Sequence, residues 1–180
     1  MKRIISLILI TTLLFIVPTA HATQEAGTSA SLMANEVQNQ EVMLKKLVVR
    51  EFLAQHNSPM LAHADDFVDI SLKYGLNPYL LPSISGVEST FGRFLMPNSY
   101  NPFGWGGGYI YFDSWNDGIE TVSSGLHKNY LGKGAISIEQ IGHIYSESPR
   151  WSRNVRYFMN QMNALEQEKR LYFSQLAVEL

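Results

Sequence analysis

Residues 75–92 read GLNPYLLPSISGVESTFG, and this stretch decides how the middle of the chain folds. Asn77 is a good helix N-cap, Pro78 suits the first turn, and Gly92 can take the left-handed conformation that closes a helix. The sequence therefore predicts a helix over 78–91. Four apolar residues at helical spacing form its buried face: Leu80, Ile84, Val87 and Phe91.

Glu88 is the carboxylate of this helix, and its position is unusual. It lies four residues after Ile84 and three before Phe91, so it borders the buried face. Partial burial disfavours a charged carboxylate, so we expect a raised pKa, which is what a general acid requires. The alternative is a partly exposed glutamate that covers apolar surface and pairs with Arg93 or Arg153.

The N-terminus has the pattern of an export signal. Lys2 and Arg3 precede an apolar run over 4–17, and Ala20-His21-Ala22 resembles a signal-peptidase site. The alternative is a membrane anchor, but the run is shorter than the roughly 20 residues that span a bilayer. We therefore predict a signal peptide over 1–22 and a secreted or cell-envelope protein without a stable membrane span after cleavage.

Composition limits the remaining classes. The chain has no cysteine and is 46% hydrophobic, so an exported fold would depend on its apolar core. The formal net charge is −2, and removal of Lys2 and Arg3 makes it more negative still. Because phosphate binding needs a basic surface, nucleic acid is not an expected partner. Histidine and acidic spacing predicts no metal site, and we expect a monomer without a cofactor.

Helical patterns occupy most of the rest of the chain. A polar leader over 23–31 precedes a helix over 32–55, and capping signals at Ser58, Ser114, Ser137 and Ser148 open four further helices. Between them, NPFGWGGGYIYF (101–112) combines turn residues with aromatics and predicts a small β-hairpin. We expect a mostly α fold with the hairpin as one cleft wall, divided into 23–57 and a domain over 58–180.

Four segments in this order resemble the bacterial glucosaminidases of glycoside hydrolase family 73, which belong to the lysozyme-like superfamily. They are the helix ending in Glu-Ser, the Asn-Pro-Phe-Gly stretch, the following helix, and the Tyr-x-x-x-Pro-x-aromatic segment, and they span about 67–162: GLNPYLLPSISGVESTFG, NPFGWGG, FDSWNDGIETVSSGL and YSESPRWSRNV.

The resemblance implies an α+β lysozyme-like fold and cleavage of β-1,4 bonds in peptidoglycan glycan strands. Glu88 would be the catalytic acid, and the substrate-binding residues would be Tyr145, Trp105, Phe103, Asn101 and Phe91. Many family members carry a second acid in the hairpin. Here residues 104–112 contain none, and Ser146-Glu147 replaces the family's Ala-Thr.

Asp113 is the nearest candidate for a second acid, although a role beside the helix cap at Ser114 is the simpler interpretation. A single acid is also chemically sufficient. The substrate acetamido group can act as nucleophile, or the muramic acid 6-hydroxyl can attack, which is lytic transglycosylation. Three alternatives stay open: a glucosaminidase, a lytic transglycosylase, and a cell-wall-binding module in which Glu88 is idle.

Overall fold

The computed structural model describes residues 21–179. Helices make up most of this region, and the elements are α1 (His21–Gln55), η1 (Leu61–His63), α2 (Ala64–Lys73), α3 (Leu80–Ser89), η2 (Trp105–Gly108), α4 (Trp115–Asn129), η3 (Leu131–Lys133), α5 (Ile138–Tyr145) and α6 (Trp151–Glu179). The predicted signal peptide lies almost entirely outside the described residues. Within them, no helix combines the length and apolar character that crossing a bilayer requires.

The chain divides into two compact units, the first ending at Gln38 and the second beginning at Asn39. The part of α1 over 21–38 belongs to the first unit. Residues 23–31, predicted to be a flexible leader, are helical, and their Ala, Glu and Gln residues favour that conformation. The second unit begins earlier than the predicted boundary at 58, because the last turns of α1 contribute buried residues to its core: Leu44, Val48, Val49, Phe52 and Leu53.

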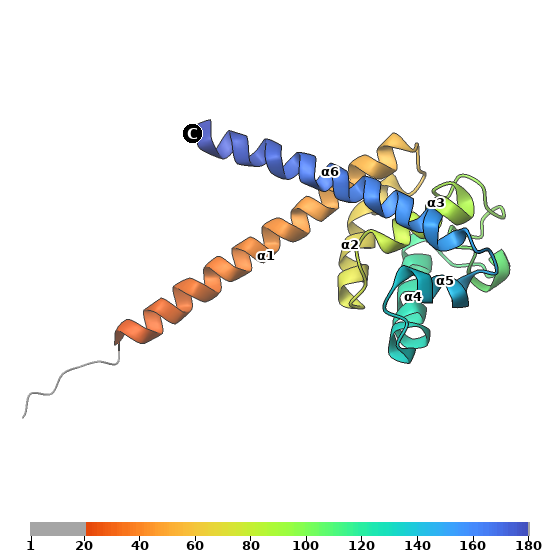
Figure 1. The fold of residues 1–180 in the computed structure, drawn as a ribbon, viewed down its shortest axis with the longest axis horizontal. Coiled ribbons are helices and arrows are strands. Elements are labelled where there is room, and N and C mark those ends of the chain that lie inside the picture. The colour runs from red at the N-terminus through yellow and green to blue at the C-terminus, as the bar shows by residue number, and fades with distance from the viewer. Residues whose placement is uncertain (1–20, 180) are drawn as a thin grey trace, which may run out of the picture. The chain divides into compact units, whose positions relative to one another are not determined.

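The second unit has a single apolar core around α3. Helix α6 packs against α3 and α5, and α2 packs against α4 (Figure 1). Gly86 allows the close approach of α6, because a Cβ on it would lie 2.7 Å from the ring of Phe91 and 3.0 Å from that of Phe158. These two rings are 5.0 Å apart in an edge-on arrangement. The aromatic contact between Phe91, just after α3, and Phe158 of α6 therefore holds the C-terminal end of α3 on α6.

The predicted helix caps explain the ends of two helices. The Ser114 hydroxyl accepts a hydrogen bond from the Asp117 backbone N–H at 3.1 Å and starts α4. Ser137 and Gln140 form a full capping box at the start of α5. Helix α3 is shorter than predicted, since it closes at Thr90, which has a left-handed φ of 52°, rather than at Gly92.

The predicted β-hairpin over 101–112 is wrong. This segment forms the short 3-10 helix η2 inside a loop, and the described part of the chain contains no strand. The physical reason is backbone conformation: Gly104, Gly106, Gly107 and Gly108 all have positive φ values, between 61° and 83°. Extended strands need strongly negative φ, so these glycines coil the chain instead of extending it.

Candidate functional site

Glu88 lies in the last turn of α3 and is exposed in a cleft, but its carboxyl group has close neighbours. The Trp151 indole N–H donates a hydrogen bond to Glu88 Oε1 at 2.7 Å. Trp151 is the first residue of α6 and only 2% exposed, so its ring is fixed by the core. The contact between α3 and α6 thus sets the orientation of the carboxyl group.

Partial desolvation raises the pKa of the Glu88 carboxyl, and the hydrogen bond from Trp151 opposes this only in part. Among the described residues no lysine, arginine or histidine forms an ion pair with Glu88, including Arg93 and Arg153. The pairing with Arg93 or Arg153 is therefore not found, although Glu88 is exposed as that alternative expects. A carboxyl group of this kind holds its proton to higher pH than an ordinary glutamate.

Gly104 brings the loop over 101–110 into direct contact with this carboxyl group. A Cβ on Gly104 would lie 2.8 Å from Glu88 Oε2, and the residue has a φ of +62°. The backbone conformation therefore favours glycine, and a side chain here would displace the Glu88 carboxyl group. The backbone of this loop, rather than a strand, covers one side of Glu88.

Asn101 holds this loop in shape. Its side-chain amide donates to the carbonyls of Trp105 and Ile110 at 2.9 and 3.0 Å, and its oxygen accepts from the Trp105 N–H at 3.0 Å. The residue lines the cleft but is only 3% exposed. Both amide hydrogens are used within the protein, so Asn101 supports the loop, and its contact with substrate stays a prediction.

Tyr145 ends α5 and is half-buried beside Glu88 in the cleft lining. Its hydroxyl donates to the Phe103 carbonyl at 2.6 Å, and its ring stacks on Trp151 with centroids 4.8 Å apart. Burial, together with the nearby charge of Glu88, raises the pKa of Tyr145 well above its usual range. The hydroxyl therefore stays protonated and ties the loop to α5.

The other three aromatic residues that were predicted to bind substrate differ in their burial. Phe91 and Phe103 are 2% and 0% exposed and pack in the core, so the expectation that their rings meet a sugar is corrected. Trp105 is half-buried, with its ring 5.8 Å from Tyr145 and 6.2 Å from Tyr130. It packs with these two tyrosines and is not among the residues that line the cleft. The sequence around these aromatic residues contains no signal that distinguishes a buried ring from an exposed one, so their burial could not be predicted.

The cleft itself has a volume of about 590 Å³. Its remaining walls come from two segments that the sequence did not predict to line the site, Phe94–Met96 after α3 and Ser146–Ser148 after α5. Phe94 is 69% exposed, an unusual state for a large apolar ring, and Glu147 adds a second carboxyl group to the lining. The departure from the family pattern at Ser146-Glu147 was the available signal for the second segment.

Asp113 does not line this cleft. It is exposed, and its backbone N–H donates to the Asp117 carboxylate at 3.1 Å ahead of α4. The arrangement matches the simpler interpretation of Asp113 as a residue flanking the helix cap. In residues 21–179, no cluster of His, Asp and Glu side chains has the arrangement of a metal site.

Comparison with models of known protein families gives no match for this chain, and no curated protein matches its sequence. The resemblance to glucosaminidases thus stays a prediction.

Proposed function

We propose that this protein is an exported glycosidase that cleaves β-1,4 bonds of peptidoglycan, with Glu88 as general acid. The observation that carries the proposal is a carboxyl group with a raised pKa in an open cleft, held by Trp151 and without a cationic partner among the described residues. A general acid must keep its proton until the leaving oxygen needs it. The raised pKa of Glu88 suits that requirement better than the lowered pKa of a salt-bridged carboxylate would.

The shape and lining of the cleft support a sugar chain as substrate. A volume of about 590 Å³ is within the usual range for ligand sites. Exposed Phe94 and Met96 offer apolar surface for the hydrophobic faces of sugar rings, and backbone groups of Gly104, Gly107 and Gly108 are accessible beside it. The four-segment resemblance to glucosaminidases supports N-acetylglucosamine as the sugar whose bond is cut.

Lytic transglycosylation is the second candidate, and one observation favours it. Asp113, the predicted second acid, lies outside the cleft, which is compatible with a one-acid reaction. In that reaction the 6-hydroxyl of muramic acid replaces water.

Digestion of purified peptidoglycan tests the proposal. The protein without residues 1–22 is incubated with sacculi, and the soluble products are analysed by mass spectrometry before and after borohydride reduction. New reducing N-acetylglucosamine ends are the expected result. Anhydro-muramic ends would assign the protein as a transglycosylase. Intact sacculi across a range of pH, with the protein still sedimenting with them, would identify a binding module instead.

A further inference from the structure

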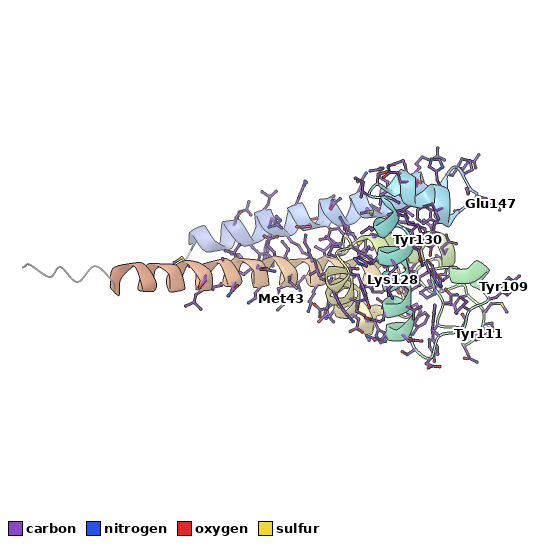
Figure 2. The ribbon with its side chains drawn as sticks, turned by 90° about the horizontal axis from the view of Figure 1, so that it is seen from below. Met43, Tyr109, Tyr111, Lys128, Tyr130 and Glu147 are labelled. Atoms are coloured by element: carbon purple, nitrogen blue, oxygen red, sulfur yellow. The ribbon has the colours of Figure 1, made fainter. Side chains whose placement is uncertain are left out.

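We infer that Glu147 is the second catalytic carboxylate, the general base that activates water in the cleft; the inference rests on the proposed glycosidase function. Glu147 lines the same cleft as Glu88 but comes from a different part of the fold, the turn between α5 and α6. Figure 2 shows Glu147 and Tyr109 toward the same end of the second unit. Gly104, Gly107 and Gly108 of the loop that covers Glu88 line the same cleft as Glu147.

The carboxylate of Glu147 has no hydrogen-bond or ion-pair partner among the described residues. Five other glutamates outside the cleft form ion pairs with lysine or arginine: Glu41, Glu51, Glu120, Glu139 and Glu166. In the part of the chain that the structure describes, Glu147 makes neither an ion pair nor a hydrogen bond, and it is exposed. Its charge is therefore available to a water molecule or a substrate in the cleft.

The backbone that carries Glu147 is nevertheless well supported on both sides. Tyr145 is fixed by its bond to the Phe103 carbonyl and its stacking on Trp151. On the other side, the Ser146 hydroxyl accepts the Ser148 N–H at 3.2 Å, and the Ser148 carbonyl accepts the Trp151 N–H at 3.1 Å. Trp151 thus bonds both to Ser148, the residue after Glu147, and to the carboxyl group of Glu88. Such support is what a positioned catalytic group needs.

The chemistry balances with these two groups. Glu88 gives its proton to the glycosidic oxygen while the bond from that oxygen to C1 breaks, and the bonding pair stays on the oxygen. Water attacks C1 from the opposite face, and Glu147 takes the proton that this water loses. Proton exchange with solvent then returns Glu88 to its acid form and Glu147 to its carboxylate form. This sequence is inverting hydrolysis.

Glu147→Gln tests the inference, because it removes the base and keeps the size of the side chain. The matched control is Glu168→Gln, an exposed glutamate of α6 outside the cleft. We expect kcat on peptidoglycan to fall by about 10²–10⁴-fold in Glu147→Gln with KM and melting temperature little changed. The control should keep the native rate.

Azide and product stereochemistry complete the test. In Glu147→Ala, azide can attack C1 without a base, so we expect it to restore turnover and give an α-glycosyl azide. Wild type should release α-configured reducing ends, detected by NMR at early times. A native rate in Glu147→Gln, a loss confined to KM, no effect of azide, or anhydro ends from wild type would each overturn the role of Glu147. If Glu88→Gln is inactive and Glu147→Gln fully active, only this inference fails; if wild type cleaves nothing, the proposed function fails.

Discussion

Glu166 and Glu88 have opposite shifts in the pKa of their carboxyl groups. Glu166 on α6 is 9% exposed, whereas Glu88 on α3 is exposed in the cleft. Burial raises the pKa of Glu166, but hydrogen bonds from Tyr79 and Arg170 and the charge of Lys45 outweigh it, and the pKa ends below its ordinary value. Glu88 has the raised pKa, because partial desolvation of its carboxyl group outweighs the one hydrogen bond that it accepts among the described residues, from the neutral Trp151 indole.

The comparison shows that the bonding partners of a carboxyl group, more than its burial, decide the direction in which its pKa shifts here. The Glu166 network joins α1, the N-cap of α3 and α6 through Lys45, Tyr79 and Arg170, with the Glu166 carboxylate at its centre. Glu88 is oriented by a group that carries no charge. The surroundings of Glu166 lower the pKa of its carboxyl group, and those of Glu88 raise it.

The largest effect should come from Glu88→Gln. The glutamine oxygen can still accept the Trp151 hydrogen bond, so the fold should be retained, but the proton donor is lost. We expect cleavage of peptidoglycan to fall by about 10²–10⁴-fold. Release of soluble fragments measures the rate, and circular dichroism confirms the fold. Native rates in a folded variant would remove Glu88 from the mechanism.

Glu166→Gln should lower the stability of the fold and leave the activity unchanged, the opposite of what we expect for Glu88→Gln. It leaves Lys45, Tyr79 and Arg170 without the carboxylate that they share, so we expect a loss of about 1–3 kcal/mol in the free energy of unfolding. Activity per folded molecule should stay native. Urea unfolding measures the loss, and Glu168→Gln on the exposed face of α6 is the control. An unchanged urea midpoint would show that the network does not stabilise the fold.

The two glutamates should also give opposite pH dependence of stability. For Glu88, whose pKa is raised in the folded state, the stabilising contribution is full below the unfolded value near 4.5 and is lost as pH rises through the folded value. For Glu166, whose pKa is lowered, the contribution is present above about 4.5 and is lost as pH falls through the folded value.

Melting curves between pH 3 and 8 test this on the two glutamine variants. Relative to wild type, Glu88→Gln should gain stability as pH rises, and Glu166→Gln should lose it. Differences of the same sign in both variants would contradict the comparison.

Phe94→Ala should have the smallest effect. The ring is 69% exposed, so its removal should barely change the melting temperature. Loss of an apolar platform for sugar should raise KM a few-fold while kcat stays near native. Phe173→Ala provides the control, since Phe173 is an exposed phenylalanine of α6 outside the cleft. Equal KM values for wild type and Phe94→Ala would exclude the ring from glycan binding.

Much of the helical framework was predictable because its signals are local. Ser114 with Asp117 and Ser137 with Gln140 are three residues apart, and both caps are present as the sequence predicts. The border position of Glu88 was also predictable from helical spacing. Its hydrogen-bond partner was not, because Trp151 lies 63 residues further along the chain and no periodic pattern links the two.

The loop over 101–112 shows where prediction from local sequence patterns fails. Alternating aromatics and glycines there fit a hairpin, yet the fold depends on Asn101 satisfying backbone groups four and nine residues later. Glu147 was missed for a related reason. Its place in the cleft depends on how α5 meets α6, which is a property of packing and not of the residues beside it.

The bond between Trp151 and Glu88 makes this indole a fluorescent reporter. The chain has three tryptophans, and only Trp151 donates its ring N–H to a carboxyl group among the described residues. When Glu88 loses its proton, the electric field across that ring changes, and the emission changes with it. Subtracting the titration of Trp151→Phe from that of wild type therefore reads the ionisation of Glu88 in the resting protein, with no substrate required.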